Sequence, residues 1–469
     1  MCNRGPNMVA STISPLYQAL RATLRAAVKV FYGDIEVTGG EHMPATGPTI
    51  IACNHPNSIV DPLLLGTVTQ RQIAYCARDG LFRVPLFGRV LRSVGAIPIR
   101  RRSDHGASTD NTDAFAACGA VLAEGGVLAI FPEGKTHGHL RIEPLKTGTA
   151  RIAVAAETGA PARQRLGVRI VPVGITYLVR HAFRSDIHVA FGPPIEVAEA
   201  VAAAGDEAQA VRALTTRIGD ALRELAVHVE KTEDERLIAQ VTAIVVGIRA
   251  DGGLDAGGQS PAERTALVRR VVDAYRWLAE VEPGRTQELR DRLERYMEER
   301  EALGLGGEKP ALQHRGERRL SLRGAPRIAV LVVAAPLAAF GLLTSVVPHA
   351  LLRLLMQPLR LSTDRVALFK LLAGAAIFAA AYAVEVALVA RLFGVVSAVV
   401  FGLSLVPAAL FARRYLIETR LHRLQIRSLG AWRRTGRLEA LRAERRALAE
   451  ALAELRVRYL DHVVQRSRS

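Results

Sequence analysis

The sequence contains few of the residues that would indicate a metal site or a disulfide framework. Only four cysteines occur in 469 residues, far apart and without a paired metal-binding motif. We therefore expect free thiols in a reducing compartment and no bound metal. The N-terminal segment also lacks the long apolar run of a secretory signal peptide, because Arg21, Arg25 and Lys29 interrupt its apolar residues at every fourth position.

Negative charge and aromatic side chains are also scarce. Lys and Arg number 62 against 45 Asp and Glu, which gives a formal net charge of +17. This balance favours an anionic partner, either nucleic acid or the headgroups of acidic lipids. Because only 5% of the residues are aromatic, few rings could stack on bases, and the chain also holds apolar runs of membrane length. We therefore expect membrane lipids as partners and no nucleic acid.

Residues 1–33 are predicted to form an amphipathic helix. Ser14-Pro15 is typical of a helix start, and the residues that follow are apolar along one side and basic along another. Two interpretations fit this pattern. The helix could lie on a membrane surface, or it could pack on its own domain.

Short apolar runs alternate with helical patterns across residues 34–228, which is typical of an α/β layer domain. Strands are expected at 49–52, 73–76, 96–99, 127–131, 170–175 and 187–191, and helices at 84–94, 109–124 and 149–157. The strands are short and apolar enough to predict a mixed sheet that is flanked by helices.

A polar loop that contains His55 and Asp61 follows the first of these strands. Histidine has an unperturbed pKa near neutral pH, and a carboxylate within hydrogen-bond reach can orient its ring. The pair could therefore deprotonate a hydroxyl group. A second interpretation stays open from the loop alone, in which Asp61 caps a helix that starts at Pro62 and His55 only ties down the loop.

Three further blocks lie at strand ends or in loops of this domain. Gly95-Ala96-Ile97-Pro98-Ile99-Arg100 leads into Arg101 and Arg102, so a phosphate site is plausible, although a solvated basic edge fits these last two arginines better. Phe131-Pro132-Glu133-Gly134 forms a rigid bend that presents a carboxylate, although an ordinary turn would look similar. Val171-Pro172-Val173 reads as a core strand that could border a pocket.

In order and rough spacing, these four blocks resemble the signature blocks of the glycerolipid acyltransferases, the lysophosphatidate and glycerol-3-phosphate acyltransferase superfamily. Four ordered blocks are far more specific than any one of them. The resemblance covers roughly residues 31–200, less than half of the chain. It implies transfer of an acyl group to a lipid hydroxyl at a membrane surface, with acyl-CoA or acyl-carrier protein as co-substrate and no further cofactor.

The resemblance also implies roles for individual residues. His55 would act as the general base and Asp61 would orient it. Arg100 would hold the phosphate of the acceptor, and the substrate-binding residues would be Asn57, Gly95, Arg100, Glu133 and Gly134.

The loop departs from the family in its length. Five residues separate His55 from Asp61, where the family more often has four, so one residue must bulge if the two side chains are to meet. The longer loop resembles the branch that acts on glycerol-3-phosphate and related acceptors. It leaves open whether the first or the second acylation is catalysed.

Residues 229–310 are predicted to form an accessory helical region. A glycine-rich break at 251–258 precedes Ser260-Pro261-Ala262-Glu263, which is a capping-box start of a helix. A second helix after Pro283-Gly284 would complete a helical hairpin. Residues 311–327 are expected to be a basic linker.

Residues 328–412 are predicted to be a transmembrane region of two or three spans, with apolar segments at 328–352, 371–384 and 392–412. Basic residues flank the region on both sides, which places both flanks in the cytoplasm and favours an even number of crossings. Two crossings with one re-entrant or interfacial segment fit, and three spans with the tail outside stay open. We expect a multi-pass protein of the cell inner membrane with its catalytic domain on the cytoplasmic face.

Residues 413–469 read as a basic helical tail. Leucines repeat in heptad fashion from Leu438 to Leu455, which is typical of a coiled coil, a self-packing hairpin or an amphipathic helix on the membrane. Self-association through this helix is one expectation.

The sequence thus predicts a layered α/β acyltransferase domain, a helical segment and C-terminal transmembrane helices. The alternative to an enzyme is a non-catalytic membrane scaffold that binds acidic lipid through a degenerate acyltransferase domain.

Overall fold

A computed structural model of the chain describes residues 32–58, 60–83, 87–100, 110–159, 165–177, 185–251, 260–302, 325–357, 363–432 and 437–466, with isolated positions between 18 and 28. The chain divides into two compact units. One comprises Met1–Ile238 with Ser260–Val272, and the other comprises Ala239–Gln259 with Asp273–Ser469.

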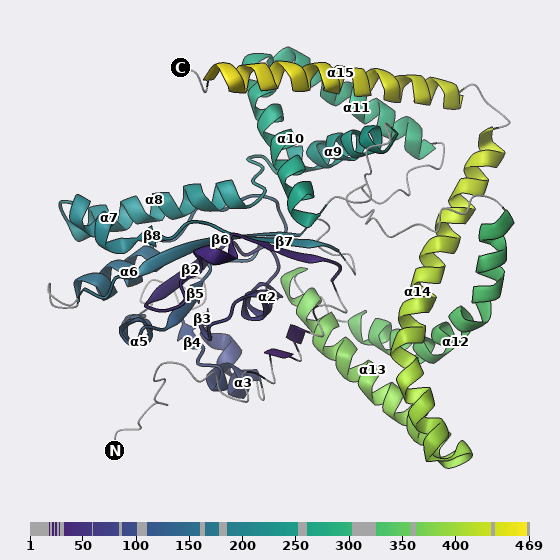
Figure 1. Ribbon diagram of the computed structural model, residues 1–469, viewed down its shortest axis with the longest axis horizontal. Helices are drawn as coiled ribbons and strands as arrows, with labels where there is room; N and C mark the ends of the chain where they lie inside the picture. Colours follow the sequence, from purple (N-terminus) through teal and green to yellow (C-terminus); the bar gives the residue numbers. More distant parts are fainter. Residues whose placement is uncertain are drawn as a thin grey trace. The chain divides into compact units, whose positions relative to one another are not determined.

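The first unit is built on an eight-stranded mixed sheet (Figure 1). Its strands are β1 (Ile35–Thr38), β2 (Thr49–Cys53), β3 (Ile73–Arg78), β4 (Ile97–Ile99), β5 (Val127–Ile130), β6 (Arg169–Tyr177), β7 (Ile187–Phe191) and β8 (Ile195–Glu196). The order is β1-β7-β6-β2-β5-β3-β4, with β8 beside β6. Strands β6, β2, β5, β3 and β4 run parallel, whereas β7 is antiparallel to β6. The predicted mixed sheet is therefore confirmed.

Short helices join the strands and cover the sheet. They are α2 (Val60–Val68), α3 (Phe87–Ser93), α5 (Thr112–Ala123), α6 (Gly148–Thr158), α7 (Val197–Ala203) and α8 (Glu207–Leu225), with 3-10 turns at Gly40–His42 and Asp79–Arg83. All six predicted strands are present, with ends that differ from the prediction by two residues or fewer. Residues 84–86 and 109, where two predicted helices begin, lie outside the described residues. Strands β1 and β8 were not predicted, because β8 has only two residues and Glu36 interrupts the apolar residues of β1.

The sheet separates two apolar cores. Successive side chains of a strand point to opposite faces, so Ile50 and Ala52 pack toward α5, α6 and α8, while Ile51 and Cys53 pack toward α2. All four side chains are fully buried, which explains the unbroken apolar run of this central strand. The arrangement places the start of α2 just beyond the carboxyl end of β2.

Few residues of the predicted N-terminal helix are described. Val28 is buried in the core beside α2, and the Arg25 guanidinium donates a hydrogen bond to the Thr67 carbonyl over 2.9 Å. These contacts agree with the interpretation in which the segment packs on its own domain. Residues 1–17 lie outside the described residues.

Helices follow the sheet along the chain. α9 (Asp234–Asp251) precedes α10 (Pro261–Val281), and α11 (Pro283–Ala302) follows α10 directly after Glu282. The predicted capping box is confirmed, because the Ser260 N–H donates to Glu263 Oε2 over 2.9 Å and the Glu263 N–H donates to Ser260 Oγ over 3.3 Å.

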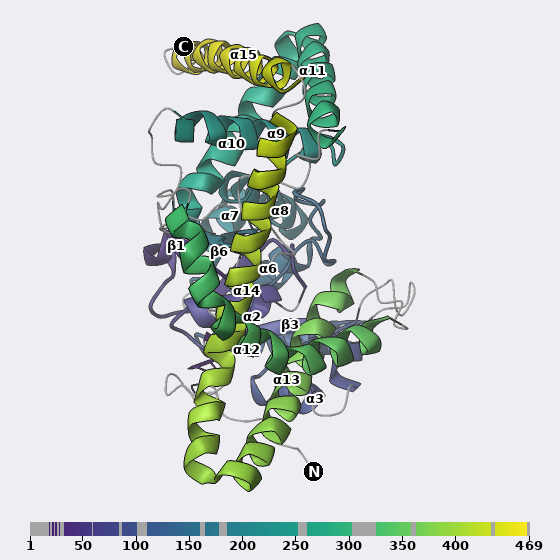
Figure 2. The same cartoon turned by 90° about the vertical axis from the view of Figure 1, so that its right-hand side faces the viewer.

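The C-terminal helix α15 (Arg437–Arg466) packs beside α11 within the second unit (Figure 2). Arg292 of α11 binds Glu444 over 3.0 Å, and the rings of Trp277 and Tyr459 lie 5.8 Å apart. Three leucines of the heptad repeat are buried, namely Leu441, Leu448 and Leu455. In the structure these leucines lie on the helix that packs beside α11, so α15 packs on an earlier helix of the same chain.

Three long helices fill the rest of the second unit, namely α12 (Ala325–Met356), α13 (Thr363–Phe393) and α14 (Val395–Trp432). Among the described residues, the segments long and apolar enough to cross a membrane are Ala329–Leu355, Ala376–Phe393 and Val395–Leu416. A Cβ atom added to Gly341 would lie 2.1 Å from the Ala408 carbonyl oxygen, so α12 and α14 meet backbone to backbone. These helices indicate that the chain associates with a membrane.

Candidate active site

The loop after β2 is attached to the neighbouring strand β6 by Asn54. Its amide oxygen accepts a hydrogen bond from the Ile175 N–H over 2.7 Å, and its amide nitrogen donates to the Ile175 carbonyl over 3.0 Å. The side chain is buried and both of its polar ends are satisfied. The next residue, His55, therefore starts from a fixed point at the carboxyl edge of the parallel strands.

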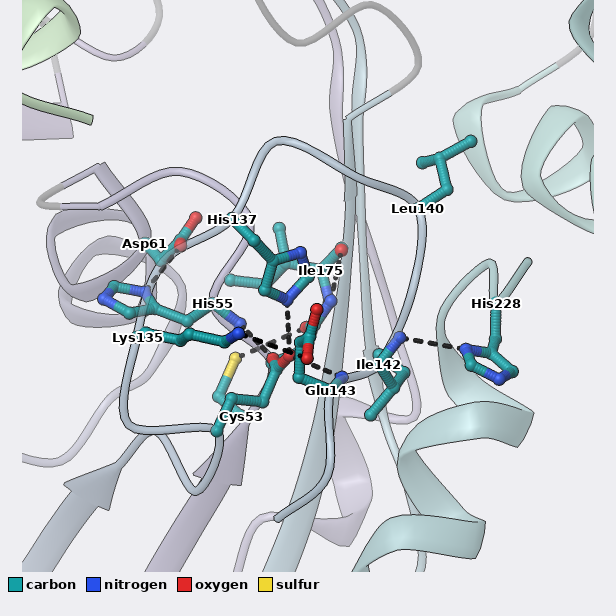
Figure 3. A network of polar contacts seen from close by, with 12 residues as sticks. Cys53, His55, Asp61, Lys135, His137, Leu140, Ile142, Glu143, Ile175 and His228 are labelled. Atoms are coloured by element: carbon teal, nitrogen blue, oxygen red, sulfur yellow. Dashed lines mark hydrogen bonds and ion pairs between the residues drawn. The ribbon is translucent and has the colours of Figure 1, made fainter. Parts of the chain in front are cut away.

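His55 and Asp61 face each other across this loop (Figure 3). His55 Nδ1 lies 2.9 Å from Asp61 Oδ2, and the carboxylate is fully buried while the histidine is 9% exposed. The imidazole also stacks on the Phe131 ring, with centroids 4.1 Å apart. An ionised carboxylate only accepts hydrogen bonds, so Nδ1 donates the proton to Asp61 and Nε2 is left as the acceptor. Among the described residues, no hydrogen bond joins a protein group to Nε2.

The longer loop closes around a bulge, as its length led us to expect. Ser58 has a φ of 44°, in the left-handed region that non-glycine residues seldom adopt. Just before it, the Asn57 N–H donates to Asp61 Oδ2 over 2.7 Å. The bulge thus turns the chain so that both His55 and the Asn57 amide reach the same carboxylate oxygen.

Asp61 does not cap α2, so the predicted helix cap is wrong. The helix already includes Val60, and the carboxylate points back to the loop instead of to a helix N–H. Its second oxygen, Oδ1, accepts a hydrogen bond from the Tyr177 hydroxyl over 2.6 Å. The sequence could not show this partner, because 116 residues separate the two side chains. Three donors therefore converge on Asp61.

Two buried tyrosines, Tyr32 and Tyr177, contact residues of the loop. The rings of Tyr32 and Tyr177 are 5.7 Å apart, and the Asn57 amide nitrogen donates to the Tyr32 hydroxyl over 3.1 Å. Burial, together with the negative charge of Asp61, raises the pKa of both tyrosines. Both hydroxyl groups therefore keep their protons. Asn57, which the sequence predicted to bind substrate, thus uses its backbone N–H to bind Asp61 and its side-chain amide nitrogen to bind Tyr32.

Glu133 binds the backbone of the loop at His55. Its Oε1 accepts a hydrogen bond from the His55 backbone N–H over 2.9 Å, and its Oε2 accepts one from the Glu143 N–H over 2.9 Å and also binds His137 Nε2. The side chain is only 2% exposed. The structure thus places this carboxylate behind His55, where it fixes the backbone, and Lys135 extends the network by an ion pair with Glu143 at 3.3 Å (Figure 3).

Both predicted site glycines occupy tight turns. Gly134 has a φ of 69° and donates its N–H to the Phe131 carbonyl over 3.0 Å, and a Cβ atom there would lie 2.7 Å from Lys146 Nζ. Gly95 has a φ of 73° and donates to the Arg92 carbonyl over 3.1 Å. Only glycine adopts such angles without strain. These residues shape the backbone at the ends of β5 and α3.

Arg100 follows β4 at the other end of the sheet. The Asn111 side chain bonds both its backbone N–H and its carbonyl, each over 2.9 Å, and the arginine is exposed. Strands β3 and β5 separate β4 from β2, and among the described residues no contact joins the arginine to His55, Asp61 or Glu133. Arg101 and Arg102 lie outside the described residues.

The thiol nearest to the pair is a poor nucleophile. Cys53 is fully buried, and burial raises its pKa, with a further contribution from the charges of Asp61 and Glu133. In the described part of the chain, no group of His, Cys, Asp and Glu is arranged to hold a metal ion.

Sequence reasoning missed three residues of this site, namely Tyr32, Tyr177 and His137. A signal was present for Tyr177, which is the last residue of the strand that holds Val171-Pro172-Val173. His137 follows Glu133 by four residues, so a short turn of the chain is enough to bring the two side chains into contact. Tyr32 gave no signal, because it precedes the first strand of the domain.

The chain is similar to known acyltransferases. The model of the Acyltransferase family matches residues 34–176. Glycerol-3-phosphate O-acyltransferase 1 of Saccharomyces cerevisiae is 41% identical over 76 residues, which cover 16% of this chain and 10% of that protein. The 1-acyl-sn-glycerol-3-phosphate acyltransferase of Bacillus subtilis is 33% identical over 123 residues, or 26% of this chain and 57% of that protein.

A solved structure, the 1-acyl-sn-glycerophosphate acyltransferase of Thermotoga maritima, matches 46% of this chain and 82% of its own at 17% identity, with a TM-score of 0.35. The chain spans less than two thirds of the length of the yeast and Bacillus relatives. The family match and these relatives show that the chain carries, over residues 34–176, a domain of the glycerolipid acyltransferase superfamily.

Proposed function

We propose that this chain is a membrane-bound O-acyltransferase of phospholipid biosynthesis. It would move a fatty acyl group from acyl-CoA or acyl-carrier protein to a hydroxyl of glycerol-3-phosphate or 1-acylglycerol-3-phosphate. The observation that carries the proposal is the His55–Asp61 pair, in which Nδ1 is held by the carboxylate and Nε2 is left as a proton acceptor. A scaffold that only binds lipid would have no use for such a base.

The pair can carry out acyl transfer in one addition and one elimination. His55 Nε2 takes the proton of the acceptor hydroxyl while its oxygen attacks the thioester carbonyl, and Asp61 stabilises the imidazolium that forms. When the tetrahedral intermediate collapses, the carbon–sulfur bond breaks and the thiolate takes the proton back from Nε2. The products are an ester and a free thiol.

No covalent acyl-enzyme is required in this scheme. The Cys53 thiol is buried and keeps its proton, so it is a poor nucleophile. Direct transfer depends on holding the hydroxyl, the thioester and His55 in line, which by itself supplies a large share of rate enhancement.

The test measures acyl transfer to both acceptors by folded His55→Ala and Asp61→Ala variants. Loss of the base should lower kcat by about a hundred- to ten-thousand-fold. His42→Ala is the matched control, because its Nδ1 binds the Phe191 carbonyl and no carboxylate. Unimpaired transfer to both acceptors by His55→Ala would overturn the proposal.

The acceptor and the donor require a comparison of substrates. Purified protein supplied with each acceptor and each thioester in turn would identify the preferred pair from the lipid products. Arg100, which is exposed at the end of β4, stays our candidate for the acceptor phosphate. Arg100→Ala should then raise KM for the acceptor and leave KM for the thioester unchanged.

The contact between α11 and α15 bears on the membrane topology. α11 precedes the three apolar helices and α15 follows them, yet Arg292 binds Glu444, and Glu282, which directly precedes α11, binds Arg458. Two segments that touch must lie on the same side of a membrane, which supports an even number of crossings. The basic flanks support the same conclusion and favour the cytoplasmic face of the inner membrane.

A reporter fused after Ser469 tests this topology in cells. A cytoplasmic signal is expected if two helices cross and one segment re-enters or lies at the interface. A periplasmic signal would instead mean three crossings and would contradict the contact of α11 with α15.

A further inference from the structure

The two oxygens of Asp61 are held by different parts of the protein. Oδ2 accepts hydrogen bonds from the catalytic loop itself, from the Asn57 N–H over 2.7 Å and from His55 Nδ1 over 2.9 Å. Oδ1 accepts a bond from the Tyr177 hydroxyl over 2.6 Å. Without this bond, both remaining donors would hold the same oxygen, and the carboxylate could rotate about its Cβ–Cγ bond.

Tyr177 is well placed to stop that rotation. It ends β6, which pairs with β2 on one side and with β7 on the other, and its side chain is 5% exposed. Its ring packs at 5.7 Å from the ring of Tyr32. The hydroxyl is thus positioned by the sheet and not by the loop that carries His55.

The bond also changes the charge that His55 meets. Burial and the negative charge of Asp61 raise the pKa of Tyr177, so the phenol stays a donor at any working pH. A hydrogen bond to an ionised acceptor is short and strong, and it takes up part of the negative charge. Less of that charge is then left to attract the proton that His55 must release to the departing thiolate.

We propose that Tyr177 is a positioning residue of the acyl transfer, which locks the Asp61 carboxylate in the plane that His55 needs and weakens its hold on the histidine proton. The inference rests on the proposed function. The other titratable groups packed around His55 and Asp61 come from the N-terminal segment, β2 and the β5 loop, namely Tyr32, Cys53, Glu133 and His137.

The experiment compares Tyr177→Phe with Tyr75→Phe in steady-state acyl transfer across the pH range. Tyr75 is the matched control, because its hydroxyl donates to the Pro62 carbonyl over 2.8 Å, also at the start of α2, but does not touch Asp61. Each variant loses one tyrosine hydrogen bond, which is buried for Tyr177 and half-buried for Tyr75. A merely structural role would therefore lower the stability of the variants and leave both pH profiles in place.

We expect Tyr177→Phe to lower kcat about tenfold, which corresponds to about 1.4 kcal/mol of activation free energy. KM for both substrates should stay within about twofold, because the hydroxyl is buried and donates to Asp61. The acid limb of kcat/KM should move up by about half a pH unit, because the carboxylate would hold the histidine proton more strongly. Tyr75→Phe should keep the wild-type kcat and limb.

A second variant keeps the inference testable if Tyr177→Phe fails to fold. Replacing Tyr177 by 3,5-difluorotyrosine keeps the ring and the bond but makes the hydroxyl a stronger donor, so the acid limb should move to lower pH. An unchanged limb in this variant, or a Tyr177→Phe profile that matches Tyr75→Phe, would overturn the inference. His55→Ala in the same assay separates the two claims, since full activity there would refute the proposed function itself.

Discussion

Replacing Glu133 by Gln tests whether this carboxylate organises the active site from behind. The two side chains have almost the same shape, but the carboxylate has two acceptor oxygens and the amide has one oxygen and one NH₂ donor. In the structure, Oε1 faces the His55 N–H and Oε2 faces the Glu143 N–H, each at 2.9 Å. Whichever way the amide turns, its NH₂ group points at a backbone N–H.

The cost follows from that mismatch. A buried donor that loses its acceptor destabilises the folded state by about 1–3 kcal/mol. His137 can relieve one conflict by accepting from the new NH₂ group, but one backbone N–H still lacks an acceptor. If the His55 backbone shifts by about 1 Å to avoid the amide, kcat can fall by about a hundredfold.

A matched control exists in the same domain. Glu157 is also 2% exposed, but its Oε2 accepts one hydrogen bond from the Val168 N–H over 2.8 Å and its Oε1 has no partner. In Glu157→Gln the amide oxygen can keep that bond and the NH₂ group meets no donor. We therefore expect little change in stability and wild-type kinetics for this variant.

The assay measures the urea midpoint of unfolding in detergent and steady-state acyl transfer for both variants. Glu133→Gln should lose both stability and kcat, and Glu157→Gln should lose neither. Wild-type kinetics in folded Glu133→Gln would refute the reasoning, as would equal losses in the two variants.

Three further substitutions test particular features of the fold. Gly134→Ala should lower stability by about 1–2 kcal/mol in chemical denaturation, because its φ of 69° is strained for alanine and the new Cβ would press on Lys146. Ser58→Gly should raise stability by about 0.5–1 kcal/mol in the same assay and keep activity, because glycine relieves a φ of 44°. Arg264→Ala should cost about 3–5 kcal/mol, seen as a lower thermal midpoint, because it leaves Asp186, its partner at 2.9 Å, as a buried charge.

The part of the site that the sequence revealed consists of residues that directly follow predicted strands. His55 and Asp61 stand at the end of one strand, and Glu133 stands at the end of another. Parallel neighbours bring their carboxyl ends to one edge of the sheet, so residues at those ends meet. Such local patterns could be read without knowing the sheet order.

The contacts of the site that the sequence did not predict join residues far apart in the chain. The bond from Tyr177 to Asp61 joins residues 116 positions apart. The backbone contacts of Glu133 could not be predicted for a related reason. A carboxylate after a strand looks exposed in the sequence, and only the fold shows that it is buried against the His55 backbone.

The extra residue between His55 and Asp61 now has a structural explanation that bears on substrate choice. The loop absorbs it at Ser58, and the hydrogen bond of the pair still spans 2.9 Å. A loop with five intervening residues can therefore present a base in the same relation to its carboxylate that a shorter loop would need. We therefore expect the acceptor to be selected by groups that contact it and not by the length of this loop. Exchange of single residues at the rim, starting with Arg100, is a sharper route to acceptor preference than a change of loop length.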